Sequence, residues 1–359
     1  MHKPDHLRRI LLIRNDRIGD LVLTLPAIEA VRRTWPSAHL ALLASSYAAP
    51  LLADSALVDK VMLDEPAQSA RALADKFKSE SYDAAIVFNY TKRACLAAWL
   101  ARIPRRVCWA YKPLGFLTAN RRVRLHRSQP PVHEARFALA FAERLGCAAA
   151  ELDPTDMKAR LEVDPIAAAL VRRQIERELG TAGPLFGVHP LNSHSAYNWP
   201  LSRYMELVAR LAQVGRVVVT GHAKERRSLD QIRSQLPTDV RKRVLFLCDL
   251  SLTELVAAVS ELNVLTVSST GPMHIAAAIG TPVVGLFSPH PSHVPAKWAP
   301  LGRKRTLFVA PLEQDENPRV PRERGAAVMA RITVEEVLAA NLAYAMASPP
   351  AASRVNHAA

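Results

Sequence analysis

A short run of small polar residues, Ser269-Thr270-Gly271, separates a buried apolar strand from an Ala-rich helix. We expect Pro272 to take the first helical position, where the missing N–H group costs nothing. The open backbone N–H groups and the positive dipole end of this helix then suit a phosphate or diphosphate. Gly271 would let that anion approach closely, and the ring of His274 would point toward it. An ordinary capped helix start would show the same residues.

A single carboxylate stands at a similar place near the N-terminus. Asp20 lies where the first predicted strand passes to its helix. An aspartate there can cap the helix, or it can take a proton from an incoming hydroxyl group. The turn contains one glycine, Gly19, and lacks the G-x-G-x-x-G spacing of dinucleotide-binding turns, which argues against a dehydrogenase.

Polar groups also follow three strands in the second half of the chain. Asn192 and Ser193 come after one strand, Glu225 after the next and Leu250 after the third. Glu225 fits either an acid in the first helical turn or a carboxylate that accepts hydrogen bonds from both ribose hydroxyls. Leu250 could offer an apolar contact to a base. Because ligands of such sheets bind at the carboxyl ends of the strands, these residues predict a nucleoside diphosphate site.

The elements that position these residues follow a βα pattern. Short apolar, often β-branched runs alternate with amphipathic stretches, which is typical of parallel βα units. Helices are expected between the strands, with a first-half helix at 133–145 and second-half helices at 166–179 and 333–346. After Phe287 the pattern weakens through a Pro- and Arg-rich region to about Gly325. The predicted strands are residues 10–14, 40–44, 58–63, 84–88, 106–109, 185–189, 216–220, 244–247, 264–267 and 283–287.

This pattern predicts an α/β protein of the GT-B type, with two Rossmann-like doubly wound domains that face each other across a cleft. The chain of 359 residues is long enough for two cores. We place a first domain at 1–160, a second, nucleotide-binding domain at 161–346 and a disordered tail at 347–359. Hydrophobic content of 49% with 22% charged residues is typical of a folded protein.

The formal net charge of +14 is unevenly distributed. No acidic residue occurs between Asp83 and Glu134. This block favours an anionic partner, such as a phosphorylated or carboxylated substrate, an anionic membrane surface or nucleic acid, although a solvated basic face has the same composition. Its basic residues are Lys92, Arg93, Arg102, Arg105, Arg106, Lys112, Arg121, Arg122, Arg124 and Arg127.

No metal, disulfide or membrane-spanning signal accompanies these features. The four cysteines are far apart, and no D-x-D pair occurs that could bridge a metal to a diphosphate. We therefore expect no metal and no resident cofactor, and a nucleoside diphosphate as the bound ligand. No apolar run approaches the ~20 residues that span a bilayer, so any membrane contact should be peripheral. The stretch 10–13 is too short for a signal peptide, and a reducing cytoplasm fits free cysteines.

Three motifs together resemble glycosyltransferase family nine, the ADP-heptose:lipopolysaccharide heptosyltransferase family. They are Ile18-Gly19-Asp20 with Leu23-Thr24-Leu25-Pro26-Ala27, the Trp199-Pro200 step, and the segment from Ser269 to Ala278. The similarity covers roughly residues 7–346. It implies a GT-B fold, a sugar donor carried on ADP in the second domain, and an acidic lipid A/Kdo or core-oligosaccharide acceptor in the first.

The resemblance also implies roles for individual residues. The catalytic aspartate of the family matches Asp20, and its ribose-contacting glutamate matches Glu225. Its two small polar residues ahead of the W-P step match Asn192 and Ser193. The T-G-x-x-H element of the family matches Thr270, Gly271 and His274.

Two positions depart from the family pattern. Tyr197 stands where the family usually has a lysine that contacts the donor phosphate, so a positive charge is lost. Lys224 or His194 could offset that loss. Ser269 stands where the family usually has an aspartate that holds donor sugar hydroxyls, which leaves the sugar open.

These features suggest a direct displacement with inversion. Asp20 would deprotonate an acceptor hydroxyl, which attacks the anomeric carbon while the nucleoside diphosphate leaves onto the helix start at Thr270. One carboxylate is enough, because no covalent glycosyl intermediate is formed. Four basic residues that follow strands of the first domain could hold acceptor anions, or could be exposed solubilising charges. These residues are Arg14, Arg17, Lys92 and Arg93.

Two other functions fit the same residues. A GT-B enzyme could epimerise or hydrolyse a nucleotide sugar, and would then need no acceptor. A non-catalytic nucleotide or RNA binder could use the aromatic residues within the basic block, most of which we expect in the core instead. Nucleic acid is the less favoured partner, and we expect a cytoplasmic protein that works at the inner membrane. The aromatic residues are Tyr90, Trp99, Trp109, Tyr111 and Phe116.

Overall fold

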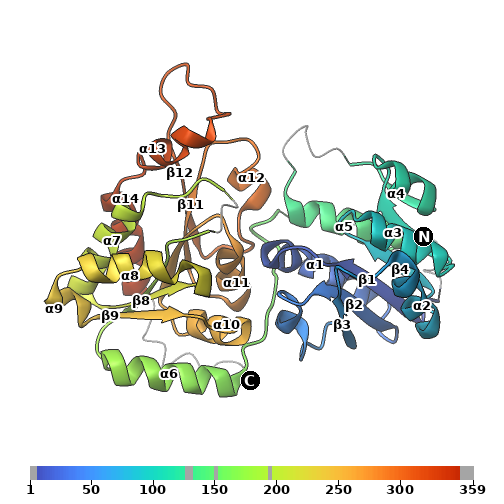
Figure 1. The fold of residues 1–359 in the computed structure, drawn as a ribbon, viewed down its shortest axis with the longest axis horizontal. Helices are drawn as coiled ribbons and strands as arrows, with labels where there is room; N and C mark the ends of the chain where they lie inside the picture. The colour runs from blue at the N-terminus through green and yellow to red at the C-terminus, as the bar shows by residue number, and fades with distance from the viewer. Residues whose placement is uncertain (1–5, 126–131, 149–152, 193–195, 348–359) are drawn as a thin grey trace. The chain divides into compact units, whose positions relative to one another are not determined.

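The computed structural model describes residues 6–125, 132–148, 153–192 and 196–347. The chain divides into two compact units, Met1–Leu161 and Glu162–Ala359. Each unit contains a six-stranded parallel sheet with helices on both faces (Figure 1). The predicted α/β class with two doubly wound domains is confirmed, and the division lies one residue from the predicted boundary at 160. The predicted tail lies outside the described residues apart from Ala347, which ends the last helix.

The first sheet has the strand order β3-β2-β1-β4-β5-β6. All these strands are parallel, but the direction in which successive strands are added to the sheet reverses between β1 and β4. The carboxyl ends of β1 and β4 therefore form the switch point at which such sheets bind ligands. The three-residue strand β6 was not predicted, because two of its residues are arginines. The strands are β1 (Arg9–Arg14), β2 (His39–Ser45), β3 (Lys60–Asp64), β4 (Ala84–Val87), β5 (Arg105–Trp109) and β6 (Arg121–Val123).

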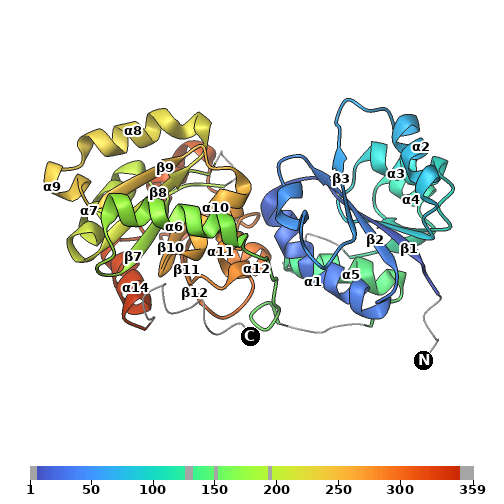
Figure 2. The same cartoon turned by 90° about the horizontal axis from the view of Figure 1, so that it is seen from below.

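Helices cover both faces of this sheet. On one face α1 (Ile18–Thr34) packs against α5 (Glu134–Leu145), and on the other α2 (Ala70–Glu80) packs against α3 (Lys92–Leu100) (Figure 2). The short helix α4 (Pro113–Thr118) follows β5 and packs against α3. Because both faces are covered, central strands such as β1 have a continuous apolar and buried interior, residues 10–13, rather than an alternating pattern. A short 3-10 turn, η1 (Ala49–Leu52), follows β2.

The second sheet has the order β12-β11-β10-β7-β8-β9, which is the same topology with its switch point between β7 and β10. Strand β12 lies in the region where the predicted pattern weakened, and it pairs in parallel with β11. Prolines and arginines flank β12 and interrupt the apolar pattern, so this strand was not predicted. The strands are β7 (Leu185–His189), β8 (Arg216–Gly221), β9 (Val244–Cys248), β10 (Val264–Ser268), β11 (Val283–Phe287) and β12 (Arg305–Val309).

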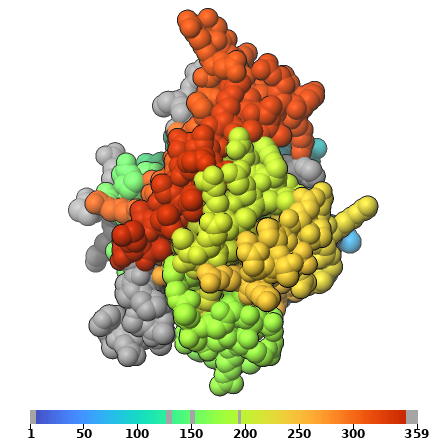
Figure 3. Space-filling model, turned by 90° about the vertical axis from the view of Figure 1, so that its left-hand side faces the viewer, coloured from blue at the N-terminus to red at the C-terminus, as the bar shows by residue number. Residues whose placement is uncertain are grey.

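Two apolar cores cover the two faces of the second sheet. Helices α6 (Pro165–Leu179), α10 (Leu252–Ser260) and α11 (Gly271–Ile279) contribute to one core. Helices α7 (Leu201–Val214), α8 (Arg226–Gln235) and α14 (Val334–Ala347) contribute to the other. Figure 3 shows α14, in red, lying against α7, in yellow-green. The shorter elements are η2 (Ala223–Glu225), α9 (Thr238–Arg241), α12 (Pro295–Trp298), η3 (Arg322–Arg324) and α13 (Gly325–Met329).

The last helix is tied to the centre of the second sheet by a buried polar pair. Asn341 of α14 donates its Nδ2 to Thr266 Oγ1 of β10 at 2.8 Å, and to the backbone carbonyl of Val337 at 2.7 Å. Both polar side chains are fully buried. Since an unpaired buried amide is costly, this pair fixes how α14 sits on β10.

Three of the five aromatic residues in the basic block are not in the core. Trp109 is buried against Phe137 and Phe141, as predicted. Trp99, Tyr111 and Phe116 are exposed, so the core prediction is wrong for them. Trp99 lies on α3, Phe116 lies on α4, and Tyr111 lies two residues before α4. Helix α4 has only six residues and can bury only one of its sides. No helix in the described part of the chain is long and apolar enough to cross a membrane.

Candidate functional site

Asp20 lies beside the switch point of the first sheet. It is the third residue of α1, and Arg17 is the N-cap residue, without a side-chain capping bond. Asp20 therefore does not cap the helix as the simpler interpretation proposed. Its carboxylate belongs to the first helical turn, where the helix dipole favours a negative charge, and its side chain is 15% exposed.

Arg14, the last residue of β1, holds this carboxylate in place. Its side chain is 4% exposed, and its Nη2 lies 2.6 Å from Asp20 Oδ1. Its Nε lies 3.0 Å from Asp16 Oδ1. A buried guanidinium must be paired, so these contacts fix the orientation of Asp20. The sequence pattern predicted contact between Arg14 and an acceptor anion, whereas in the structure Arg14 is occupied by these two carboxylates.

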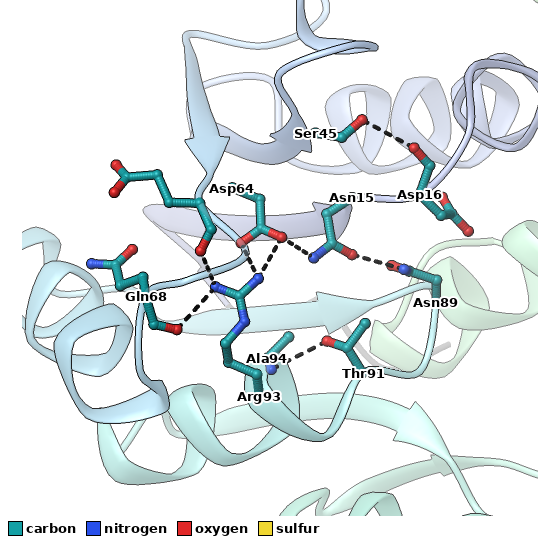
Figure 4. A network of polar contacts seen from close by, with 10 residues as sticks. Asn15, Asp16, Ser45, Asp64, Gln68, Asn89, Thr91, Arg93 and Ala94 are labelled. Atoms are coloured by element: carbon teal, nitrogen blue, oxygen red, sulfur yellow. Dashed lines mark hydrogen bonds and ion pairs between the residues drawn. The ribbon is translucent and has the colours of Figure 1, made fainter.

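A second polar network joins the carboxyl ends of β1, β3 and β4 (Figure 4). Asn15 Nδ2 donates to Asp64 Oδ2 at 2.6 Å, and Asn89 Nδ2 donates to Asn15 Oδ1 at 2.7 Å. Arg93 donates from Nη2 to both oxygens of the buried Asp64 carboxylate, at 2.7 and 2.6 Å, and from Nη1 to two backbone carbonyls after β3. Arg93, also predicted to bind the acceptor, is therefore occupied within the first unit.

Sequence reasoning did not single out Asn15, Asp64 and Asn89. Each follows or ends an apolar strand, and that position was the available signal. The bond between Asn15 and Asn89 links the loops after β1 and β4, the two strands of the switch point. Sugar hydroxyls commonly pair with such amide and carboxylate groups, so this edge is chemically suited to a carbohydrate.

Arg17 and Lys92 remain exposed at the same edge. Arg17 precedes α1, and Lys92 is the first residue of α3. Neither takes part in the ion pairs found among the described residues of this unit. Their contact with an acceptor anion stays a prediction.

The predicted donor residues follow four strands that are adjacent in the second sheet. Across the sheet these strands come in the order β10-β7-β8-β9. All four run parallel, so their carboxyl ends meet at one edge. The topology therefore brings the loops at Asn192, Glu225, Leu250 and Thr270 to the same edge of the second unit, although they are widely separated in the chain.

Helix α11 begins at this edge without a side-chain cap. Thr270 is the N-cap residue, with φ −151° and ψ 173°, and its side chain makes no capping hydrogen bond. Gly271 is the first helical residue and Pro272 the second, so the prediction for Pro272 is wrong by one position. A missing N–H group is tolerated there too, because the first turn has no intrahelical partners. His274 is buried behind this turn.

Two other helices of the second unit, α6 and α10, are capped by side chains, whereas α7 and α8, like α11, begin without a side-chain capping bond. Asp164 accepts from two backbone N–H groups of α6, at 2.7 and 3.0 Å. Ser251 and Glu254 form a reciprocal capping box at the start of α10. Of α6, α10 and α11, α11 is the one whose N-cap side chain makes no capping hydrogen bond, and a helix start of this kind suits an anionic ligand.

The loop after β7 is held by Asn192. Its side chain is buried, and its Nδ2 donates to the backbone carbonyl of Ala196 at 3.0 Å. Ser193 and His194 lie outside the described residues. Asn192 is therefore placed at the switch point with a structural bond of its own, and its contact with a donor stays a prediction.

Tyr197, which departs from the family pattern, is anchored inside the second unit. Its hydroxyl donates to the backbone carbonyl of Val320, and its ring lies edge-on to His290 and His293, at centroid distances of 5.8 and 5.7 Å. A Cβ atom at Gly325 would come within 2.8 Å of the same ring. Tyr197 therefore packs as an aromatic residue and supplies no positive charge.

Glu225 closes a capping box on the loop after β8. Its Oε2 accepts from the backbone N–H of His222 at 2.9 Å, and His222 Nδ1 accepts from the backbone N–H of Lys224 at 3.2 Å. The first interpretation, an acid at a helix start, is thus confirmed. A carboxylate can accept several hydrogen bonds at once, so a ribose contact is compatible with it. Lys224 is exposed beside it.

A buried histidine lies below this edge. His189, the last residue of β7, has its Nδ1 2.9 Å from Thr220 Oγ1 of β8. Burial lowers the pKa of His189 to about 4, while the nearby charge of Glu225 acts to raise it. The imidazole is therefore neutral at neutral pH and couples β7 to the Glu225 loop. Sequence reasoning missed both residues, whose signal was a polar side chain at the end of an apolar strand.

Leu250 lies farther out, after the edge strand β9. It lines a groove between α6 and α10 together with Ile166, Leu170 and Glu254. Its predicted contact with a base stays a prediction. Among the described residues, no group of three or more His, Cys, Asp or Glu side chains is placed to hold a metal ion. The Cys95 and Cys108 sulfurs are free and lie 3.3 Å apart, a proximity that their spacing did not indicate.

Comparisons with known proteins agree with this topology. Residues 70–325 match the model of glycosyltransferase family 9 (heptosyltransferase). Lipooligosaccharide heptosyltransferase 2 of Haemophilus influenzae is 26% identical over 314 residues, which cover 83% of this chain and 88% of the relative. Lipopolysaccharide heptosyltransferase 2 of Escherichia coli is 25% identical over 290 residues, with 78% and 83% covered.

Solved structures show the same fold. The structure of E. coli ADP-heptose lps heptosyltransferase II aligns with a TM-score of 0.80 at 22% identity, covering 94% of this chain and 99% of that chain. E. coli heptosyltransferase WaaC with ADP aligns with a TM-score of 0.67 at 18% identity, covering 92% and 97%. The predicted GT-B fold is confirmed, and the chain is a member of glycosyltransferase family 9, the heptosyltransferase family.

Proposed function

We propose that this protein transfers a sugar, heptose by analogy with its relatives, from an ADP-linked donor to an anionic acceptor of the lipopolysaccharide core type. The observation that carries the donor half is the uncapped start of α11 at the switch point of the second sheet. Its backbone N–H groups and dipole would hold the diphosphate, with Thr270 and Ser269 beside it. Glu225 would accept hydrogen bonds from the ribose hydroxyls.

The chemical step is a single displacement. Asp20 takes the proton of an acceptor hydroxyl, and the oxygen attacks the anomeric carbon of the donor. The bond from that carbon to the diphosphate oxygen breaks, and ADP leaves with the bonding electron pair, so the configuration inverts. Arg14 acts as a positioning residue that aims the Asp20 carboxylate, because it is buried and bonded to it at 2.6 Å.

The leaving diphosphate is proposed to be stabilised without a metal ion. Preorganised backbone N–H groups and a helix dipole can stabilise charge that develops in the transition state. Lys224, exposed next to Glu225, is the candidate for the cation that Tyr197 does not supply. His274, buried in the first turn of α11, would support the loop that holds the diphosphate.

The acceptor half rests on the first unit. Arg17 and Lys92 are exposed at its switch point and would contact phosphate or carboxylate groups of the acceptor. The names of the relatives, which refer to lipopolysaccharide and lipooligosaccharide, support a membrane-derived acceptor. We therefore propose that the protein works at the cytoplasmic face of the inner membrane, as a peripheral protein.

A donor and acceptor panel tests the proposal. The protein is incubated with ADP-, GDP- and UDP-sugars, with and without lipopolysaccharide core, and the released diphosphate is measured. We expect release from an ADP-sugar only when the acceptor is present, and none with Asp20→Asn. Release without an acceptor would instead support hydrolysis or epimerisation. Preference for a GDP- or UDP-sugar would overturn the assignment of an ADP-linked donor. Salt-sensitive RNA binding without turnover would overturn the assignment of the protein as an enzyme.

A further inference from the structure

The first unit carries four large apolar side chains on its surface around α3 and α4. Trp99 on α3 is 48% exposed, and Tyr111, just before α4, is 47% exposed. On α4, Phe116 is 47% and Leu117 73% exposed. Helices α3 and α4 pack against each other, so these side chains belong to neighbouring elements (Figures 1 and 2). We name Trp99, Tyr111, Phe116 and Leu117 the α3–α4 patch.

Basic residues are attached directly to the α4 side of this patch. The guanidinium of Arg122 lies over the Phe116 ring at 3.9 Å from its centroid, and its Nε donates to the Phe116 carbonyl at 2.9 Å. The hydroxyl of Tyr111 donates to the backbone carbonyl of Arg124 at 2.6 Å. Each contact keeps a cationic residue beside an exposed aromatic ring.

The same holds at the other end of the patch. Arg102 follows α3, and its backbone N–H donates to the Trp99 carbonyl at 2.9 Å. Lys112 stands between Tyr111 and α4, and its Nζ lies 5.8 Å from the centroid of the Tyr90 ring. Arg102, Lys112 and Arg124 are exposed. Four cationic residues thus accompany four exposed apolar side chains.

No carboxylate within this segment balances these charges, because residues 84–133 contain no aspartate or glutamate. The neighbouring helix α2 does carry acids, but they are paired there. Glu80 lies 2.6 Å from Lys60, and Asp75 lies 3.4 Å from Lys78. The α3–α4 patch therefore combines apolar area with basic residues that the acids of α2 do not pair with.

We propose that the α3–α4 patch is a docking surface for an anionic lipid bilayer. Trp99, Phe116 and Leu117 would enter the headgroup region, while the surrounding arginines and Lys112 would contact lipid phosphates. Aromatic residues favour that interface, and each basic residue near an anionic leaflet adds attraction. A single nucleic acid strand would use the aromatic rings but gains little from an exposed Leu117. The proposal uses none of the residues assigned to catalysis or donor binding.

The second unit provides a matched control surface. Ile166 and Leu170 on α6 are 71% and 59% exposed, similar to the pair on α4. They line the groove that also contains Asp164 and Glu254. An anionic bilayer would repel those acids. Exposed apolar side chains in a groove lined by two acids and no basic residue are therefore expected not to bind the membrane.

Cosedimentation with vesicles tests the proposal on the full chain. The probes are phosphatidylcholine vesicles with about one-third phosphatidylglycerol, and phosphatidylcholine alone, neither of which contains the sugar acceptor. We expect binding to the anionic vesicles only. Phe116→Ser with Leu117→Ser should weaken it at least tenfold, and Lys112→Gln with Arg124→Gln by roughly 25-fold, at about fivefold per charge. Ile166→Ser with Leu170→Ser should leave it unchanged.

Quenching of tryptophan fluorescence by brominated lipid locates the contact. We expect quenching that disappears in Trp99→Phe, with thermal unfolding of every variant unchanged, since all these side chains are exposed. Equal binding to neutral vesicles, equal loss in the Ile166/Leu170 variant, or quenching that survives Trp99→Phe would overturn the proposal. So would binding to polynucleotide with no binding to anionic vesicles. Because the vesicles hold no acceptor, none of these outcomes depends on whether the transferase assignment holds.

Discussion

The two sheets share one topology but treat their switch points differently. At the edge of the first sheet, side chains satisfy one another: Arg14 holds Asp20, and Asn15 joins Asp64 to Asn89. At the edge of the second sheet, the helix after β10 starts with Thr270, whose side chain caps nothing. The edge of the first sheet therefore presents side chains held in fixed orientations. The edge of the second sheet presents the backbone N–H groups of a helix start.

This difference matches two kinds of chemistry. A group that moves a proton must be held at one angle and distance, which a packed network of side chains achieves. A seat for a diphosphate needs several N–H groups that converge and stay unsatisfied until the ligand arrives. The same fold can thus support both proposed tasks, and under this proposal the loops after the strands decide which task each unit performs.

The largest expected effect is the loss of turnover when Asp20, at the edge of the first sheet, is replaced. Asp20→Asn should lower kcat roughly 10²–10⁴-fold, because it removes the proposed base, while the affinity for ADP stays unchanged. Steady-state kinetics and calorimetric titration with ADP measure the two quantities. Asp16→Asn is the control, since it removes the other carboxylate on Arg14, and its effect on kcat should be much smaller. A joint loss of ADP affinity in Asp20→Asn would break the division between the edges.

Removing the Arg14 guanidinium tests whether the polar side chains at the edge of the first sheet stabilise one another. Arg14→Gln should lower the free energy of unfolding by about 3 kcal/mol, because two carboxylates lose their buried partner. Urea denaturation measures it. In the second unit, Arg210 lies 2.8 Å from Glu335 and the two side chains are 37% and 63% exposed, so Arg210→Gln should cost no more than about 1 kcal/mol and leave turnover intact. Equal costs would show that the Arg14 site is not special.

The second edge should have a pH signature in stability. The folded pKa of His189 is lowered to about 4 from 6.5, so the unfolded chain binds one more proton between these values. Stability should therefore fall as the pH drops from about 6.5 to about 4, by roughly 3 kcal/mol in total, with no further loss from this group below that. Urea denaturation across this range should show a flatter profile for His189→Gln. Parallel profiles would refute the buried neutral histidine.

Two capping boxes allow a test of Glu225. Glu225→Gln and Glu254→Gln each replace a carboxylate by an amide whose oxygen can still accept the N-cap N–H, so each should cost less than about 1 kcal/mol of stability. Only Glu225→Gln should weaken ADP binding, by about tenfold, because its carboxylate is the proposed ribose ligand. Calorimetric titration measures it. Equal ADP affinity in both variants would leave Glu225 with its cap role alone.

The smallest effect concerns the open helix start. Thr270→Ala should change the free energy of unfolding by less than about 0.5 kcal/mol, since its side chain makes no capping bond. Ser251→Ala should cost about 1 kcal/mol, because Ser251 caps α10. Thermal denaturation compares them. A loss in Thr270→Ala as large as in Ser251→Ala would show that α11 is capped after all.

Much of the architecture could be predicted from the sequence, for a physical reason. Strands covered on both faces contain continuous apolar runs, as in residues 10–13 of β1, so they stand out from their surroundings. Strands β6 and β12 did not stand out, because arginines and prolines interrupt or flank them. Their existence depends on pairing with β5 and β11, which is a tertiary effect.

The candidate site was predictable in its positions but not in its pairings. Parallel topology alone placed Asp20, Glu225 and Thr270 at carboxyl edges. The partners of these residues depend on register: Arg93 meets Asp64 across 29 positions of sequence. Three arginines and one lysine were expected to bind an acceptor. The two that are buried or half-buried, Arg14 and Arg93, instead pair with carboxylates of the first unit. Charge in a sequence reports composition, whereas only packing decides which charges reach solvent.

The buried pair between Asn341 and Thr266 has a consequence for how the protein is made. Strand β10, which leads into Thr270, is completed by a helix translated some 70 positions later. The first unit can close while synthesis continues, but the second must wait for residues 334–347 to clear the ribosome. The second unit therefore completes its fold later in synthesis than the first.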